Sequence, residues 1–355
     1  MNLKSLSLPQ RLAAGFGCVV VLASLVAGTL YLAFDIVSSR HIGDQLARAP
    51  RAWVDSLRLV ARPMDLTGLI LPRTDTGDGA AVVYDDALAW KSGNVESAYK
   101  AIVRGLGATG ADSAQWRAAA ADTALDRFVT AARRLHWRAL DRALAGADTS
   151  VRDNILTLPS PHYAVIRNAV RGLVIRGLRR AERGDTAGAR TDLQAATGLG
   201  DQVFRREPSA VGSVMGRSVV LSGAHGWERF GVLTHDTALA ARARRVQAWA
   251  ARPVGSASQL LILAPDTCLA LARDPTLVLG MRAEALIDGM MASFLRPRGF
   301  LFGPGSRYAS AVSALAGGPD TDFALLATMT RNTVRRLNTF GAKAVLREMQ
   351  KAQAR

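Results

Sequence analysis

Apolar residues recur at intervals of three and four positions along most of the chain after residue 35. This spacing places them on one face of an α-helix, whereas the alternation of every second position that is typical of a half-buried strand is rare. Ala, Leu and Arg, which favour helices, are abundant in the same segments. The pattern predicts an all-α body with very little sheet.

The segment 122–144 illustrates the pattern. Its large apolar residues fall on one stripe, formed by Leu125, Phe128, Val129, Leu135, Leu140 and Leu144. Most of its arginines lie off that stripe, so we expect an amphipathic helix that packs on its neighbours. The segment 75–79, Asp-Thr-Gly-Asp-Gly, contains turn-forming residues instead and predicts an exposed loop.

An Asp-Thr pair precedes or opens several of these periodic segments. The pairs begin at residues 122, 148, 185, 236, 266 and 320. A side-chain oxygen at such a position can accept a hydrogen bond from the free N–H groups of the first helical turn, and the Asp charge suits the helix dipole. These pairs predict helix starts.

One segment differs because it is apolar on all sides. Leu12 to Phe34 carries no charge and is bounded by Arg11 and Asp35. About 20 apolar residues cross a hydrocarbon core of roughly 30 Å, so this segment predicts a single membrane anchor. Its expected bilayer contacts are Leu12, Val20 and Leu25, with Tyr31 and Phe34 near the far interface. The expected organisation is a cytoplasmic tail over 1–11, a transmembrane anchor over 12–34 and a helical domain over 35–355.

A cleavable signal peptide is the alternative interpretation, because a short basic segment precedes the apolar run. That run is longer than the roughly 7–15 residues of a signal peptide, and its best small-residue site places Leu25 where a small residue belongs. Lys4 and Arg11 lie before the span, although arginines follow it as well. We expect a single-pass protein of the bacterial inner membrane, with its N-terminus in the cytoplasm and its bulk in the periplasm.

The segment Leu6 to Gly17, LSLPQRLAAGFG, resembles the start of bacterial chemoreceptors and sensor kinases. In that family a short amphipathic piece and a basic residue lead into the first membrane helix. The resemblance implies a cytoplasmic N-terminus.

A second resemblance concerns a helical hairpin. Leu173 to Ala196 resembles a tetratricopeptide-type helix–turn–helix, with large residues at Leu173 and Leu193, small residues at Gly177, Ala189 and Ala196, and a turn at Gly184-Asp185. The small residues would let the two helices approach closely. Arg180 departs from the family pattern, because an aromatic residue is usual there. The family folds as stacked helical hairpins that hold other proteins, so the resemblance implies a protein-binding function.

A weaker match covers Val82 to Ile102, with a turn at Gly93-Asn94 and Asp86 where a small residue belongs. The distance between the two turns is not a multiple of the 34-residue period of this family. We therefore expect an irregular, tetratricopeptide-like helical-repeat domain, with a sub-boundary near residues 253–265.

The sequence contains no recognisable catalytic constellation. No two of the five histidines have a metal-ligand spacing, and we assign no catalytic, cofactor-binding or metal-binding residue. Ser97 and Lys100 match the SxxK spacing of serine acylases, but the partner motifs are missing. Cys18 and Cys268 are interpreted as packing thiols. The segment 225–230, His-Gly-Trp-Glu-Arg-Phe, predicts a turn that leads into a helix, with Trp227 and Phe230 on its core face.

The segment 294–308, FLRPRGFLFGPGSRY, combines apolar residues with helix-breaking Pro and Gly. Such apolar residues either cover the core or face a partner or lipid. The hypothesis is a docking loop, whose candidate contact residues are Phe294, Arg296, Arg298, Phe300, Leu301 and Phe302.

The formal net charge of +16 comes from 45 Lys and Arg against 29 Asp and Glu, and only five of the basic residues are Lys. The Arg bias is typical of a GC-rich bacterial genome, and no tract of five to eight basic residues occurs, so nucleic acid is not an expected partner. The charge would face a membrane surface or an acidic protein instead.

We expect a non-enzymatic helical scaffold, an accessory subunit that stabilises a larger membrane protein complex of respiratory, photosynthetic or envelope type. Its partners would be the subunits of that complex, with the lipid bilayer contacted through residues 12–34. Two alternatives stay open, namely a single-span ligand-sensing receptor fragment and an envelope hydrolase with an unrecognised site.

Overall fold

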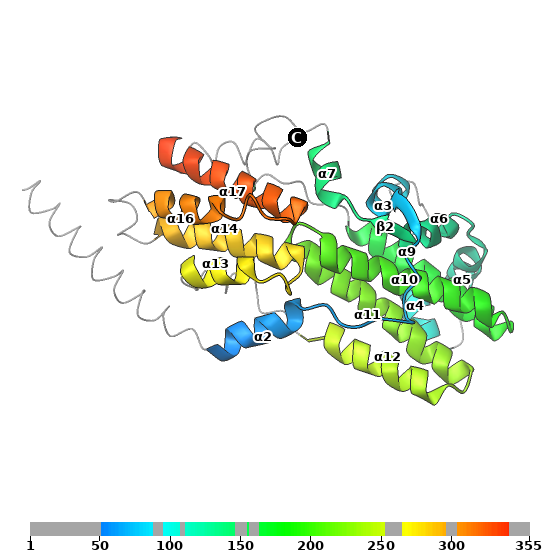
Figure 1. The fold of residues 1–355 in the computed structure, drawn as a ribbon. Helices are drawn as coiled ribbons and strands as arrows, with labels where there is room; N and C mark the ends of the chain where they lie inside the picture. Colours follow the sequence, from blue (N-terminus) through cyan, green and yellow to red (C-terminus); the bar gives the residue numbers. More distant parts are fainter. Residues whose placement is uncertain are drawn as a thin grey trace, which may run out of the picture.

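The chain folds into helices that are ordered along the sequence in three groups (Figure 1). The structure is a computed structural model that describes residues 51–87, 95–106, 111–145, 155, 163–252, 265–295 and 304–340. The first group contains α2 (Arg51–Ala61), β1 (Asp75–Asp78), α3 (Gly79–Ala87), α4 (Glu96–Val103), α5 (Ala111–Ala121), α6 (Leu125–Ala132), β2 (Arg134–His136) and α7 (Ala139–Leu144). The second contains α9 (Tyr163–Glu182), α10 (Thr186–Arg206), α11 (Ala210–Leu233) and α12 (Thr237–Ala250). The third contains α13 (Pro265–Arg273), α14 (Leu279–Leu295), α16 (Pro304–Ser313) and α17 (Thr321–Phe340).

The helices α9 to α12 lie side by side on the right in Figure 1, with α12 along the lower edge of the molecule. Consecutive helices pack on one another, and α11 also packs on α9. Close approach between α10 and α11 depends on glycine, because a Cβ atom added to Gly200 would lie 2.6 Å from the backbone nitrogen of Val220. Glycine is therefore required there by backbone-to-backbone contact between the two helices.

The third group packs around α14. This helix contacts α13, α16 and α17, and it joins the second group through α11 and α10. Its start is also tied to α2, because the backbone nitrogen of Val278 donates to the carbonyl of Ala61 at 3.1 Å. One hydrophobic core connects all three groups, and Trp227, Phe230 and Phe204 are among its largest buried side chains.

The prediction of an all-α body is confirmed for the described part of the chain, with one exception. Residues 75–78, which we expected to form a loop, are the strand β1, which pairs in parallel with β2. The backbone nitrogens of Thr74 and Asp75 both donate to the carbonyl of Arg133. This long-range pairing gives an extended shape to residues that would otherwise favour a turn.

The expected single helix over 122–144 is also wrong. The segment divides into α6, β2 and α7, and Leu135 is exposed although it lies on the predicted apolar stripe. The Asp78 carboxylate accepts hydrogen bonds from the backbone nitrogens of Arg138 and Ala80. The helix over 122–144 is thus interrupted at residues 134–138, because β2 pairs with β1 and Asp78 holds the backbone that follows it.

The segment 225–230 lies inside α11 and not at a turn before a helix, which corrects the expectation for its backbone. Trp227 and Phe230 are fully buried, as predicted. The Trp227 indole nitrogen donates to the carbonyl of Leu69 and to Thr197 Oγ1, so its polar atom is satisfied within the core.

The weaker of the two predicted hairpins, Val82 to Ile102, does not form an extended helix pair. Within the described residues α3 packs mainly on α6, whereas α4 packs on α9 and α5. Its predicted turn at Gly93-Asn94 lies outside the described residues.

Across the described ranges, no helix is both long enough and apolar enough to cross a membrane. The predicted anchor over 12–34, with Leu12, Val20, Leu25, Tyr31 and Phe34, lies outside those ranges, as does most of the proposed sub-boundary at 253–265. Both stay predictions.

Candidate functional site: two stacked helical hairpins

The segment with the tetratricopeptide-like pattern forms an antiparallel helical hairpin. α9 ends and α10 begins on either side of Gly184-Asp185, as the sequence predicts. Gly184 adopts a φ of 85°, which glycine tolerates without steric cost. The backbone nitrogen of Asp185 donates to the carbonyl of Arg180 and that of Gly184 to the carbonyl of Ala181, which is the Schellman arrangement. The Asp185 carboxylate then accepts from the Gly188 backbone nitrogen at 2.9 Å and caps α10.

The helices α11 and α12 are joined by a turn of the same geometry. His235 takes the place of Gly184, with a φ of 57°. The Asp236 backbone nitrogen donates to the carbonyl of Gly231, and the Asp236 carboxylate caps α12 by accepting from the Leu239 backbone nitrogen at 2.9 Å. The chain therefore contains two consecutive hairpins, α9–α10 and α11–α12, whose turns have the same geometry. The hairpins pack on each other through α9, α10 and α11.

The crossing of α9 and α10 is tight. A Cβ atom at Gly177 would lie 3.2 Å from the carbonyl oxygen of Ala189 and 3.3 Å from Leu193 Cγ. The predicted packing residues Leu173, Ala189, Leu193 and Ala196 are all fully buried. A larger residue at position 177 would therefore press against α10.

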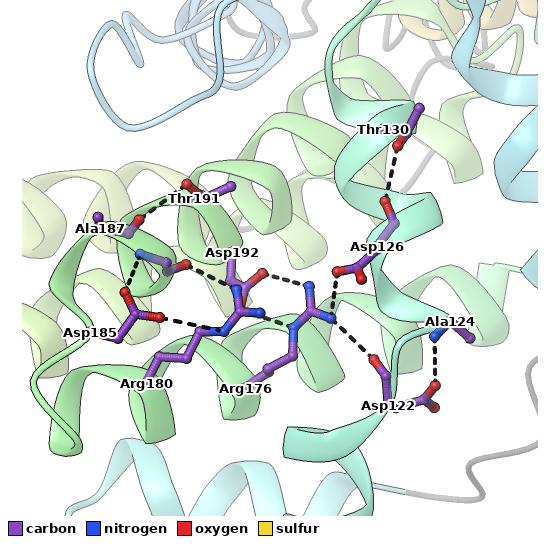
Figure 2. A network of polar contacts seen from close by, with 11 residues as sticks. Asp122, Ala124, Asp126, Thr130, Arg176, Arg180, Asp185, Ala187, Thr191 and Asp192 are labelled. Atoms are coloured by element: carbon purple, nitrogen blue, oxygen red, sulfur yellow. Dashed lines mark hydrogen bonds and ion pairs between the residues drawn. The ribbon is translucent and has the colours of Figure 1, made fainter.

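A buried ion-pair network lies beside this crossing (Figure 2). The Asp192 carboxylate is completely buried on α10 and accepts two hydrogen bonds from Arg176 of α9, from Nε at 3.0 Å and from Nη2 at 2.7 Å. Nη1 of Arg180, one turn later on α9, lies 3.0 Å from Asp192 Oδ2. Two arginines of one helix thus hold one carboxylate of the other.

The network extends in both directions from Asp192, as Figure 2 shows. Nη1 of Arg176 lies 2.8 Å from Asp126 Oδ1 and donates to the backbone carbonyl of Asp122 at 3.1 Å, which ties the hairpin to α6. On the other side, Arg180 lies near Asp185, the residue that caps α10. The network connects α6, α9, α10 and the hairpin turn.

Burial and charge have opposite effects within this network. Burial raises the pKa of Asp192, against the opposing influence of the Arg176 hydrogen bonds and the two guanidinium charges. Burial would lower the pKa of Arg176, but its hydrogen bonds to Asp192 and the charges of Asp192 and Asp126 raise it overall. The buried charges are stable because they are paired and hydrogen-bonded.

Other buried polar groups of the hairpins also have partners within the fold. Glu207 accepts from the Trp137 indole at 3.1 Å and from the Tyr163 hydroxyl at 3.2 Å. Asp201 accepts from Arg73 at 2.8 Å and from Arg205 at 2.7 Å. These hydrogen bonds hold the C-terminal part of α10 against the neighbouring elements.

Arg217 of α11 is buried, and no carboxylate of the described residues pairs with it. Its Nη2 donates to the carbonyls of Trp249 and Arg252 at the C-terminal end of α12, where the helix dipole favours a positive charge. Burial lowers the pKa of Arg217 to about 10, and Arg252 adds to this effect. The guanidinium stays charged at neutral pH and caps the second hairpin.

Residues 62–74, which we call the strap, cross α10, α11 and α12. Four hydrogen bonds tie its backbone to these helices. The backbone carbonyls of residues 64, 67, 68 and 69 accept from the side chains of Arg205, Arg242, Gln194 and Trp227, respectively. The side chains of Leu66, Leu69 and Leu71, which belong to the strap, are buried. The strap joins α2 to both hairpins.

The candidate chemical groups are placed as follows. Lys100 of the SxxK match lies 2.7 Å from Glu96 and forms an ion pair on the surface of α4. Cys268 is buried and forms no disulfide. In the described segments no group of three or more His, Cys, Asp or Glu side chains is arranged to hold a metal ion.

The predicted docking loop falls largely outside the described residues. Phe294 lies in the last turn of α14, whereas Arg296, Arg298, Phe300, Leu301 and Phe302 lie outside the structure as described. Their role in docking stays a prediction.

Sequence reasoning missed Asp192 and the second hairpin. Asp192 lies between the core positions Ala189 and Leu193, and a charged residue on an apolar face is a signal that a buried partner exists. The turn of the second hairpin has His235 where the first has Gly184, so only the Asp-Thr pair that follows it indicated a helix start.

Comparisons with protein-family models, with curated protein sequences and with solved structures give no match to this chain.

Proposed function

We propose that the protein is a non-enzymatic helical scaffold, anchored to the bacterial inner membrane by residues 12–34 and stabilising a larger membrane protein complex as an accessory subunit. Its helical body would lie in the periplasm and contact the other subunits of the complex.

The observation that carries the proposal is the stacking of two hairpins of like geometry, α9–α10 and α11–α12. In helical-repeat proteins such stacking creates extended surfaces on which other proteins bind. The tetratricopeptide-like pattern of Leu173 to Ala196 supports the same interpretation, because proteins of that family hold other proteins.

The pairing of buried carboxylates inside the hairpins also supports a scaffold. The carboxylates of Asp192, Asp201 and Glu207 are bound by side chains of neighbouring elements, so they stiffen the array. A scaffold benefits from stiffness, because a preorganised surface loses less conformational entropy on binding.

The decisive experiment measures the mass of the protein in its native environment. The full chain, carrying a purification tag, is extracted from its own membranes with a mild detergent and analysed by native mass spectrometry and native electrophoresis. We expect a large complex that contains this chain in fixed stoichiometry. Extraction as a monomer or dimer in every mild detergent would contradict the proposal and would favour a receptor fragment or a hydrolase.

The internal control is a second extraction in a harsh detergent. The large complex should then dissociate into subunits that can be identified separately by mass. The masses of these subunits should add up to that of the large complex in whole-number stoichiometry, and a mass that they do not account for would indicate bound detergent and lipid and not an assembly.

A further inference from the structure

Asp288 is a buried carboxyl group in the third helical group. It lies on α14, is 4% exposed, and its Oδ2 atom has no hydrogen-bond partner among the described residues. It therefore differs from Asp192, which is equally hidden from solvent but is held by two arginines. An ionised carboxylate without a partner is very unfavourable in such a place.

The seam between α13, α14 and α16 has little free space, and Asp288 lies close enough to it to interact electrostatically with Tyr308 of α16. A Cβ atom at Gly289 would lie 2.5 Å from the Tyr308 hydroxyl of α16 and 2.9 Å from Cys268 Cβ of α13. The Tyr308 hydroxyl donates to the Leu286 carbonyl of α14 at 2.7 Å. Gly289, the residue next to Asp288, is therefore in close contact with both neighbouring helices.

The groups around Asp288 do not compensate a negative charge. Glu284, one turn earlier on α14, adds a second acidic side chain, and the Tyr308 hydroxyl and the Cys268 thiol face the same seam. Among the described residues Glu284 is the charged group that shifts the pKa of Asp288, and α10, α11 and α17, which also pack on α14, supply no cation that does so. Burial, together with the charge of Glu284, raises the pKa of Asp288 to about 7.

We propose that Asp288 makes the packing of α14 against α13 and α16 pH-sensitive, so that the seam is closed while the carboxyl group is protonated and opens more often once it is ionised. The inference is independent of the scaffold function, because it concerns one seam within the body. The seam would respond to the binding of a proton by the Asp288 carboxyl group.

The direction of the effect follows from linkage. In an open seam Asp288 would have its ordinary pKa of 3.8, well below its value in the closed seam. The closed seam is therefore favoured most below pH 3.8, and this advantage is lost as the pH rises toward 7. The open fraction should increase roughly tenfold per pH unit in this interval and level off above it.

Cys268 provides a local probe of opening. The chain contains two cysteines, so the full-length Cys18→Ser variant has Cys268 as its single thiol. Cys268 is fully buried in the seam, and a thiol reagent can reach it only when the seam opens. The labelling rate is measured between pH 5 and pH 8 and divided by the rate of an unstructured peptide with the sequence around Cys268. This ratio removes the pH dependence of the thiol itself.

The expected result is a corrected rate that rises steeply from pH 5 to pH 7 and then becomes level. Asp288→Asn and Asp288→Ala should both reduce the rise well below tenfold per pH unit, whatever their effect on overall stability, and only a weaker rise from Glu284, whose pKa burial also raises, should be left. Asp266→Asn, which changes an exposed carboxylate of α13 in the same group, should keep it. A flat profile in the Cys18→Ser protein, or an unchanged slope in the Asp288 variants, would overturn the proposal.

Discussion

Arg176 and Asp192 meet across the crossing of α9 and α10, where Nε and Nη2 of the arginine donate to the two carboxylate oxygens at 3.0 Å and 2.7 Å. Both side chains are almost entirely buried, so neither can exchange its partner for water. In such a pair the loss of one member is more damaging than the pair itself is stabilising, because the remaining charge stays buried.

Asp192→Ala should therefore destabilise the protein strongly. The change leaves Arg176 and Arg180 without their shared acceptor, and we expect the free energy of unfolding to fall by about 3–5 kcal/mol. The measurement is urea unfolding followed by circular dichroism. The matched control is Glu182→Ala, which breaks a more exposed pair with Arg179 and should cost about 1 kcal/mol or less. Equal losses in the two variants would contradict the assigned role of Asp192.

Gly216→Ala should separate α11 from α10. An added Cβ would collide with the backbone nitrogen of Phe204, which cannot move without shifting α10. Although alanine favours helices, we expect a net loss of about 2 kcal/mol or more in the free energy of unfolding. At Gly317 nothing lies within 4 Å, so Gly317→Ala should have little effect. Thermal unfolding of both variants tests this, and an unchanged melting temperature for Gly216→Ala would refute the close contact.

His225 should make the protein less stable in mild acid. Its Nδ1 lies 3.0 Å from the Tyr99 hydroxyl, and burial lowers the pKa of His225 despite the opposing charge of Glu228. The stability that neutral His225 contributes is present above its unfolded pKa of about 6.5 and is lost as the pH falls through the lower folded value.

The test compares the free energy of unfolding at pH 7.5 and pH 5 for the wild type and for His225→Gln. The free energy of unfolding should fall less between pH 7.5 and pH 5 in the variant than in the wild type. His136→Gln changes an exposed histidine of β2 and should behave like the wild type. The same pH dependence in all three proteins would count against the role of His225.

Deletion of residues 1–35 should release the protein from the membrane. The predicted anchor over 12–34 supplies the apolar length needed to cross a bilayer, whereas no helix in the described ranges does so. Fractionation after alkaline carbonate washing should leave the full chain in the pellet and the shortened chain in the supernatant. If the full chain also appeared in the supernatant, the anchor prediction would be wrong.

The docking hypothesis is tested by changing two apolar residues of the predicted loop. Phe300→Ser combined with Phe302→Ser should weaken association with the membrane complex, because apolar contact area would be lost. Co-purification from mildly extracted membranes measures the association. Val232→Ser alters an exposed apolar residue of α11 and should leave it unchanged. Full association of the double variant would remove the loop from consideration.

Local sequence patterns were sufficient for the helical character of the described body and for several of its helix starts. Asp185, Asp236 and Asp320 all accept from a backbone nitrogen three residues later, as the Asp-Thr pairs predict. These interactions join neighbours in sequence, so the pattern contains all the necessary information. The same holds for Gly177, whose spacing from Leu173 already indicates a helix contact.

Features that depend on distant segments were not predicted. The pairing of residues 75–78 with residues 134–136 needs the three-dimensional position of both strands, and it is this pairing that turns Leu135 outward. The partners of Asp192 depend in the same way on the crossing of two helices. Periodicity identifies a buried face but contains no information about which charged residue meets which.

The strap gives the molecule a definite mechanical property. Its attachments run along residues 64–73 and engage α10, α11 and α12 at separate points, with buried leucines between them. A force that pulls residues 51–61 away from the body would therefore act against attachments to three helices before it reached β1. Tension that enters at the N-terminal side of the body is thus shared between both hairpins.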